Sequence, residues 1–337
     1  MRYLMFSFFI ILLFTLSCRK DKVNQICSSN FGNYCPDQYF QRSEPYPDTF
    51  HKSNTELQCI FTPDYESLEE YVYNEPVINP NNSFEFAFIR QNPSDIMSIP
   101  ELCIYDFCDN SIDIIALDVL SGISWSTKNW IIFTKSNNEL FKIKANGDSL
   151  TQLTSTGDYN NYAKWSPSGG KYLYFDASSS GTFPMKISDI SGTHIDSIDF
   201  PMSSWTWLNE EEIIYSNVGN SELRKYNLQS SNIETIINQS TIGPSGDHLH
   251  INENQEIYTQ IDQGLIRVDL SGNFDFIDSN YLTYNSGYAQ QLTDSTILLQ
   301  RFITDTTYYD DCIEYWGTYI SILNEVTGTE RRIKIPE

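Results

Sequence analysis

Six segments of the sequence share one pattern, in which an apolar residue precedes a short polar turn and then a strongly apolar run. They begin at Ile78, Trp125, Trp165, Trp207, Ile251 and Leu292. Successive segments lie 40 to 47 residues apart. A nearly constant period of this length is typical of chains built from equal units that stack on one another. This repeat constrains the fold more than any other feature of the chain.

A second marker recurs in step with the first, a polar hairpin turn late in each unit. The turns are "DFCDNS" at Asp106, "KANGDS" at Lys144, "DISGTH" at Asp189, "NLQSSN" at Asn227, "DLSGNF" at Asp269 and "EVTGTE" at Glu325. Each unit then reads as four short strands, which in the third unit are expected at residues 162–165, 171–175, 183–188 and 194–199. A four-stranded antiparallel sheet cannot bury both of its faces alone, so the units must stack around a ring.

We therefore predict an all-β fold, a six-bladed β-propeller with four-stranded antiparallel blades. The blades are expected at about residues 75–117, 118–154, 155–200, 201–238, 239–279 and 280–336. Trp125, Trp165 and Trp207 occupy the same place in successive units. A large aromatic residue at one place in each repeat favours packing between blades, so we expect these three side chains to be buried there.

The segment from Leu150 to Phe175, "LTQLTSTGDYNNYAKWSPSGGKYLYF", resembles the repeat of TolB-like propellers. In that family a "QLT" strand leads through a polar loop into "WSPDGK" and an apolar strand. Trp165, Ser166, Pro167 and Gly169 match, and Ser168 stands where the family usually has Asp. The resemblance covers about residues 75–336 and is clear in one blade only. It implies a six-bladed propeller used mainly as a binding scaffold, in a bacterial, Bacteroidota-like lipoprotein.

The N-terminus reads as a targeting segment. Arg2 precedes an apolar run from Leu4 to Leu16, which is shorter than the roughly 20 residues that span a bilayer. Ser17 and Cys18 follow it and are similar to the lipobox of bacterial lipoproteins. We predict a signal peptide over residues 1–17, lipidation of Cys18, a tether over 18–56 and the propeller over 57–337; the alternative is an ordinary secretory signal.

The chain is strongly acidic, with 44 Asp and Glu against 21 Lys and Arg, a formal net charge of −23 at pH 7. Phosphate backbones and anionic lipid surfaces repel such a protein. We expect no nucleic-acid partner, and contact with the membrane through the lipid anchor only. The expected partner is a protein or glycan of the cell envelope. The outer membrane is the favoured location, and the side on which the protein faces is open.

Six cysteines remain if Cys18 carries lipid. They are Cys27, Cys35, Cys59, Cys103, Cys108 and Cys312. An even number in an oxidising compartment permits a disulfide framework with 15 pairings. Cys103 and Cys108 are close enough in sequence to form a disulfide across a strand end. Cys27 and Cys35 could form one within the tether, and Cys59 and Cys312 would then pair with each other. In the alternative interpretation, several stay as free buried thiols.

Loops that lead into the first strand of each blade, and loops between the second and third strands, should lie on one face of a propeller. Several of them are rich in Tyr, Asn and Asp, a composition favoured at recognition surfaces. We predict a ligand-binding face made of Asp158, Tyr159, Asn160, Tyr281, Tyr284, Asp305 and Tyr308. The plainer interpretation is that Asn and Asp form turns while Tyr covers blade edges.

His248 and His250 alternate along a strand expected beside the central channel, with Asp247 adjacent. Two imidazoles on one side of a strand, together with a carboxylate, can hold a divalent metal. The sequence points to no other cofactor. This motif supports an alternative function, a metal-assisted lyase or hydrolase acting on acidic saccharides. In the plainer interpretation the two side chains pack between blades.

The absence of catalytic motifs favours a binding role. The sequence lacks HExxH, GxSxG, a glycine-rich phosphate loop and paired CxxC motifs. We also expect no hydrolase domain appended after the sixth unit. We therefore expect a membrane-anchored binding module that recognises a protein or glycan through one loop face.

Overall fold

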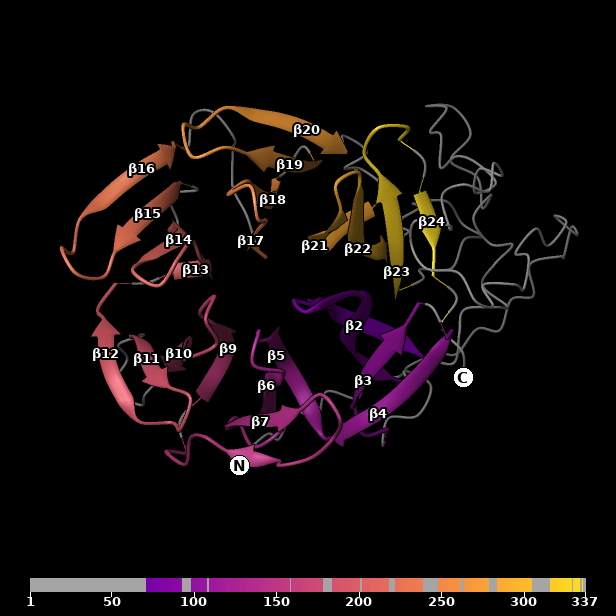
Figure 1. Ribbon diagram of the computed structural model, residues 1–337, viewed down its shortest axis with the longest axis horizontal. Coiled ribbons are helices and arrows are strands. Elements are labelled where there is room, and N and C mark those ends of the chain that lie inside the picture. The colour runs from indigo at the N-terminus through magenta and orange to yellow at the C-terminus, as the bar shows by residue number, and fades with distance from the viewer. Residues whose placement is uncertain are drawn as a thin grey trace, which may run out of the picture.

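The two recurring sequence markers become the inner and the outer hairpin of six equivalent sheets arranged in a ring (Figure 1). The first marker forms the turn between the first and second strands of each sheet, and the second marker forms the turn between the third and fourth. All pairings are antiparallel, and each sheet contains four strands that are consecutive in the chain. The predicted six-bladed propeller with four-stranded blades is confirmed.

The computed structural model describes residues 71–92, 98–107, 109–157, 159–177, 184–200, 202–217, 222–238, 248–261, 264–278, 284–304, 316–328, 330–333 and 335. The signal peptide and the tether, residues 1–56, therefore lie outside the described residues. Within these ranges, no helix is long and apolar enough to cross a bilayer.

The first three blades span residues 72 to 198. Blade 1 comprises β1 (Val72–Asn79), β2 (Asn82–Gln91), β3 (Glu101–Asp106) and β4 (Ser111–Leu117). Blade 2 comprises β5 (Val119–Trp125), β6 (Trp130–Lys135), β7 (Leu140–Lys144) and β8 (Thr151–Gln152). Blade 3 comprises β9 (Tyr159–Trp165), β10 (Lys171–Ala177), β11 (Met185–Asp189) and β12 (His194–Ile198).

The last three blades span residues 202 to 332. Blade 4 comprises β13 (Met202–Trp207), β14 (Glu212–Asn217), β15 (Leu223–Asn227) and β16 (Ile233–Ile237). Blade 5 comprises β17 (His250–Ile251), β18 (Ile257–Ile261), β19 (Gly264–Val268) and β20 (Phe274–Asp278). Blade 6 comprises β21 (Tyr284–Thr293), β22 (Thr296–Thr304), β23 (Trp316–Asn324) and β24 (Glu330–Arg332).

Apolar side chains fill the junctions between blades. Among the described residues, six buried clusters occur, and each joins two blades that are neighbours in the ring. One cluster, for example, packs Ile132 of blade 2 against Trp165 and Tyr172 of blade 3. Another packs Phe86 of blade 1 against Ile320 of blade 6 and so closes the ring. Trp125, Trp165 and Trp207 are all buried in such clusters, as their equivalent places in the repeat predicted.

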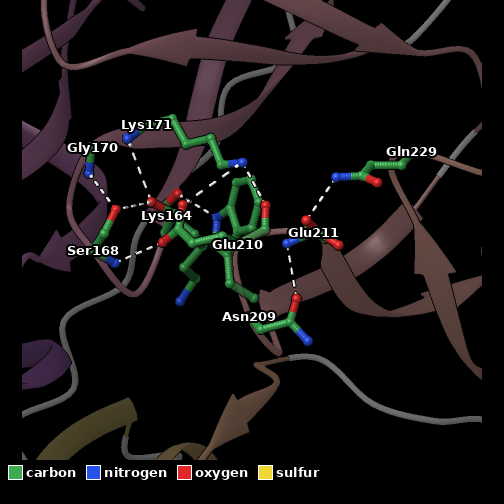
Figure 2. Close-up of polar contacts among 10 residues, drawn as sticks. Lys164, Ser168, Gly170, Lys171, Asn209, Glu210, Glu211 and Gln229 are labelled. Atoms are coloured by element: carbon green, nitrogen blue, oxygen red, sulfur yellow. Dashed lines mark hydrogen bonds and ion pairs between the residues drawn. The ribbon is translucent and has the colours of Figure 1, made fainter.

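Hydrogen bonds between neighbouring turns add to this packing on one face of the ring. Figure 2 shows the junction of blades 3 and 4, where Glu210 Oε1 accepts the backbone N–H of Ser168 at 2.7 Å. The ammonium of Lys171 donates to the Glu210 carbonyl in the same group (Figure 2). At the same junction of blades 3 and 4, the indole N–H of Trp207 donates to the carbonyl of Lys164 at 2.9 Å. Ser168 thus binds the next blade through its backbone N–H.

Polar side chains of blade 6 hold β1 at the point where the ring closes. The Gln300 side-chain oxygen accepts the backbone N–H of Glu75 at 2.8 Å, and its amide nitrogen donates to Asn74 Oδ1 at 3.0 Å. In the same way, Gln290 Oε1 accepts the backbone N–H of Ile78 at 2.9 Å. Both glutamines are buried. Side chains from one end of the chain therefore satisfy backbone groups from the other end.

Replacing Trp165 with Ala should lower the free energy of unfolding by about 3–5 kcal/mol, because a buried aromatic side chain would leave a cavity between blades 2 and 3. Its indole nitrogen has no hydrogen-bond partner in the described residues, so the loss would reflect packing. Urea unfolding followed by far-ultraviolet circular dichroism of the backbone measures this loss of stability. Val326→Ala, at a side chain that is 81% exposed, is the control and should change little. Equal stability of the two variants would contradict the packing scheme.

Replacing Gln300 with Leu should loosen the closure of the ring. Leucine fills similar space with apolar atoms but cannot accept a hydrogen bond, so the N–H of Glu75 is left unpaired. An unpaired buried N–H costs about 1–3 kcal/mol. Hydrogen exchange should therefore become faster at the backbone amides of β1. Gln229→Leu, at an exposed glutamine on the rim of blade 4, provides the comparison and should leave β1 unaffected.

Candidate functional site

The innermost strands of several blades are bent at equivalent places near the centre of the ring. Glu75, Gly122, Tyr162 and His248 all have left-handed backbone conformations, with φ between 53° and 74°. The strand registers of β1, β5 and β9 shift at these places, as in β-bulges. The remaining non-glycine residues with positive φ lie in turns and connections.

Left-handed conformations in side-chain-bearing residues cost about 1–3 kcal/mol each and persist only where the surroundings hold them. Glu75, Tyr162 and His248 are such residues in three different blades. Strain of this kind is found most often at functional sites, where it directs side chains into a pocket. The bulge also explains why β9 begins at Tyr159, three residues before the expected start, because the strand continues past the bend at Tyr162.

A cavity of about 250 Å³ lies where these bends converge. Its lining comes from all six blades, which places it on the axis of the ring. The residues are Glu75, Gly122, Ile123, Tyr162, Lys164, Ser203, Ser204, Trp205, His248 and Tyr288. A second cavity, of about 540 Å³, is lined largely by turns between first and second strands and shares Ile123 and Lys164 with the first. We call the first one the axial cavity.

Glu75 supplies a buried carboxylate to the axial cavity. Its Oε2 accepts the backbone N–H groups of Gly122 at 2.6 Å and Ile123 at 3.1 Å, and Tyr288 also hydrogen-bonds to it. Burial raises the pKa of Glu75, and these hydrogen bonds oppose the rise. Gly122 is required here because a Cβ atom would lie 2.9 Å from the backbone nitrogen of Tyr162. The carboxylate is thus already bound by the protein.

Lys164 supplies a cation to the same cavity. It lies on β9, one residue before the strand ends at Trp165. Its side chain points away from the contacts of Ser168 and Glu210 (Figure 2). Among the residues that the structure describes, none forms a hydrogen bond or ion pair with its Nζ. Burial lowers the pKa of Lys164, and the charge of Glu75 opposes this effect.

The two histidines lie beside Lys164 and are uncharged at neutral pH. Burial, followed by repulsion from Lys164, lowers the pKa of His248 and of His250 to about 3. His248 lines the axial cavity, and its ring packs against that of Tyr288 at a tilt of 35° with the ring centres 4.0 Å apart. His250 lines the second cavity. Asp247 lies outside the described residues. Among those described, no group of three or more His, Cys, Asp and Glu side chains is placed to hold a metal.

Trp205 forms part of the wall and has an unused hydrogen-bond donor. Its side chain is 4% exposed, and its indole N–H has no acceptor within the described chain. The ring meets that of Tyr162 edge to face, with the ring centres 6.5 Å apart. Tyr162 itself is 43% exposed and lies at the mouth of the axial cavity. The cavity therefore combines aromatic walls with an ammonium and an indole donor.

The predicted ligand-binding face is described only in part. Tyr159 begins β9 and is 37% exposed, three residues before Tyr162. Asn160 is fully buried, and its amide donates to Glu139 at 3.3 Å and to Thr156 at 3.0 Å, so its side chain supports the loop from inside. Tyr284 begins β21. Asp158, Tyr281, Asp305 and Tyr308 lie outside the described residues.

The cysteines are described at one position. Cys103 in β3 is a free thiol, fully buried in the cluster between blades 1 and 6, and burial raises its pKa to about 12. This matches the alternative interpretation of a buried free thiol at this position. Cys18, Cys27, Cys35, Cys59, Cys108 and Cys312 lie outside the described residues.

Sequence reasoning found His248 but missed Glu75, Lys164 and Trp205. A faint signal was present, since Lys164 places a charged residue immediately before the repeat tryptophan. Glu75 and Trp205 carry no such mark, because the bends that turn the inner strands toward the axis depend on contacts between blades. Lys164 also bears on the metal hypothesis, because an ammonium beside both imidazoles disfavours a divalent cation.

Acid should destabilise the fold through the buried histidines. An imidazole with a pKa of about 3 in the folded state and 6.5 in the unfolded state stays neutral only when folded, so its stabilising effect is complete above pH 6.5 and declines as the pH falls toward 3. Each such group contributes a slope of roughly 1 kcal/mol per pH unit. His250→Gln should therefore flatten the loss of stability between these limits, measured by urea unfolding. His194→Gln, at an exposed histidine, should keep the slope of the unmodified protein.

Comparison with protein-family models finds no match, and comparison with curated proteins finds none. Solved structures are similar in fold. A TolB-like protein from Agrobacterium tumefaciens aligns with a TM-score of 0.52 and 12% identity, over 66% of this chain and 84% of that one. Acylaminoacyl peptidase from Pyrococcus horikoshii aligns with a TM-score of 0.50 and 10% identity, over 78% and 46%.

TolB from Acinetobacter baumannii gives a TM-score of 0.48 and 12% identity, over 60% of this chain and 53% of that one, so the chain matches about half of that protein. At these identities the likeness concerns the fold alone. The chain is a six-bladed β-propeller whose structural neighbours include TolB-like propellers.

Proposed function

We propose that this chain is a ligand-binding propeller of the bacterial cell envelope, anchored by lipid on Cys18, that takes a protein or glycan at the mouth of the axial cavity. The observation that carries the proposal is the axial cavity itself. All six blades contribute to it, and three strained residues direct side chains toward it. Strained backbone at the one place where the blades converge is expected of a site preserved for a ligand.

Two exposed tyrosines of β9 supply the recognition surface. Tyr162 lines the cavity, and Tyr159 lies three residues before it on the same strand. Tyrosine offers a large, rigid contact area together with a hydroxyl, and both protein and sugar ligands use such area. The other residues of the predicted ligand-binding face belong to the same proposal.

The metal-assisted lyase or hydrolase is the weaker alternative. His248 and His250 line different cavities, and the Lys164 ammonium lies close enough to lower the pKa of both imidazoles. A divalent cation would meet this repulsion as well as the cost of leaving water. A stoichiometric metal in elemental analysis of the purified protein would reverse this ranking.

The binding role is tested with the full-length protein immobilised against envelope extract and against a glycan array. Tyr162→Ala should lose at least half of the retained ligand, because it removes the exposed ring at the cavity mouth. Phe276→Ala removes a ring of similar exposure, 47%, from the outer strand β20 and should retain the ligand. Equal retention by both variants would place the ligand elsewhere and contradict the proposal.

The anchor is tested separately, by labelling cells with a radioactive fatty acid. The unmodified chain should incorporate label and remain in the membrane fraction. Cys18→Ala should incorporate none and leave that fraction, since a single acylated cysteine is the proposed attachment. Label on the Cys18→Ala variant would contradict lipidation at this residue.

A further inference from the structure

Several acceptors of the axial cavity are occupied within the protein, whereas two of its donors have no partner among the described residues. Glu75 already accepts two backbone N–H groups, and the hydroxyl of Ser204 accepts the N–H of Leu249 at 3.0 Å. The hydroxyl of Ser203 pairs with that of Ser216 at 2.7 Å. These acceptors of the wall are thus occupied within the protein.

The donors left over are the ammonium of Lys164 and the indole N–H of Trp205. Neither has a hydrogen-bond acceptor in the described part of the chain, and Trp205 is more than nine-tenths buried. An unpaired buried donor costs about 1–3 kcal/mol, more when it is charged. Trp205 is such a buried donor, and the half-buried ammonium of Lys164 lines the same cavity, so the two together are the complement of an acceptor that is not part of the protein.

We infer that the axial cavity binds a carboxylate group, with the Lys164 ammonium as its counter-ion and the Trp205 indole N–H as its second donor. This rests on the proposed function and names the chemistry of its ligand. A carboxylate has two acceptor oxygens and one negative charge, which match two donors and one cation.

The charges nearby select a single negative charge. The imidazoles of His248 and His250 are neutral and add no positive charge to the cavity. Lys164 is the one cationic side chain in the described lining, and a single ammonium suits a singly charged carboxylate better than a doubly charged phosphate. A cationic ligand would meet Lys164 and is excluded on the same grounds.

The size of the cavity limits the ligand to one residue. Pockets for drug-sized ligands measure about 300–1,000 Å³, and the axial cavity is about 250 Å³. The rings of Tyr162, Trp205 and Tyr288 give apolar area for the body of the ligand. A terminal uronic acid of a glycan and the terminal carboxylate of a peptide both meet these conditions, and they share the carboxylate.

Isothermal titration calorimetry of the full chain in detergent tests the inference. The probes are glucuronate against glucose, and N-acetylglycine against N-acetylglycinamide, so that each acid has a neutral partner of the same shape. At least one acid should bind at millimolar concentration, at least tenfold more tightly than its neutral partner. The pair that responds identifies a sugar or a peptide as the source. Equal affinity for acid and neutral partner, or no binding of either acid, would overturn the inference.

Matched variants assign the binding to the two donors. Lys164→Met should weaken binding of the acid about 10- to 100-fold, as expected for loss of a charged hydrogen bond, while Lys164→Arg should keep the preference for the acid. Trp205→Phe keeps a ring and should weaken binding about tenfold. Lys128→Met, at an exposed lysine, should change nothing. Unaltered affinity in a folded Lys164→Met protein, judged by its melting temperature, would overturn the assignment.

The two proposals can fail separately. If Tyr162→Ala loses the envelope ligand while none of the four probes binds, the binding function stands and the carboxylate inference is wrong. If an acid binds through Lys164 while Tyr162→Ala and Phe276→Ala retain envelope ligand equally, the carboxylate site stands and the mouth of the cavity is not the recognition surface.

Discussion

Each four-stranded sheet of this protein has two apolar faces, and only the neighbouring sheets can cover them. The buried clusters span the junctions between blades, so each cluster needs residues from two of them. The cluster that joins Phe86 to Ile320 is as necessary as the others. In an open ring, the faces of blades 1 and 6 that pack against each other would be exposed to water.

Polar contacts determine how accurately the ring closes. Apolar packing is tolerant of small shifts, whereas the hydrogen bonds of Gln290 and Gln300 hold the backbone of β1 at defined positions. Arg301 has a similar role between blades 5 and 6, where its guanidinium pairs with Asp278 at 2.6 Å. Buried polar groups of this kind contribute to a unique arrangement more than to net stability.

Closure of the ring also creates the chemistry at its centre. Six inner strands converge on one axis, and bulges at Glu75, Gly122 and Tyr162 turn backbone and side chains toward it. The same bulge that presents the N–H groups of Gly122 and Ile123 satisfies the Glu75 carboxylate. Lys164 then forms no direct hydrogen bond or ion pair with the described residues, although the charge of Glu75 acts on it within the same cavity.

The repeat period and the two turn markers determined the architecture from sequence alone, because apolar alternation and turn residues are local properties that recur in every blade. Trp165 could be placed in the core for the same reason. The partnership of Glu75, Lys164 and Trp205 could not be predicted, since these residues come from three blades and are spread over 130 positions of the chain. Only the closed ring brings them together, and only the bends in its inner strands decide which of their polar atoms remain free.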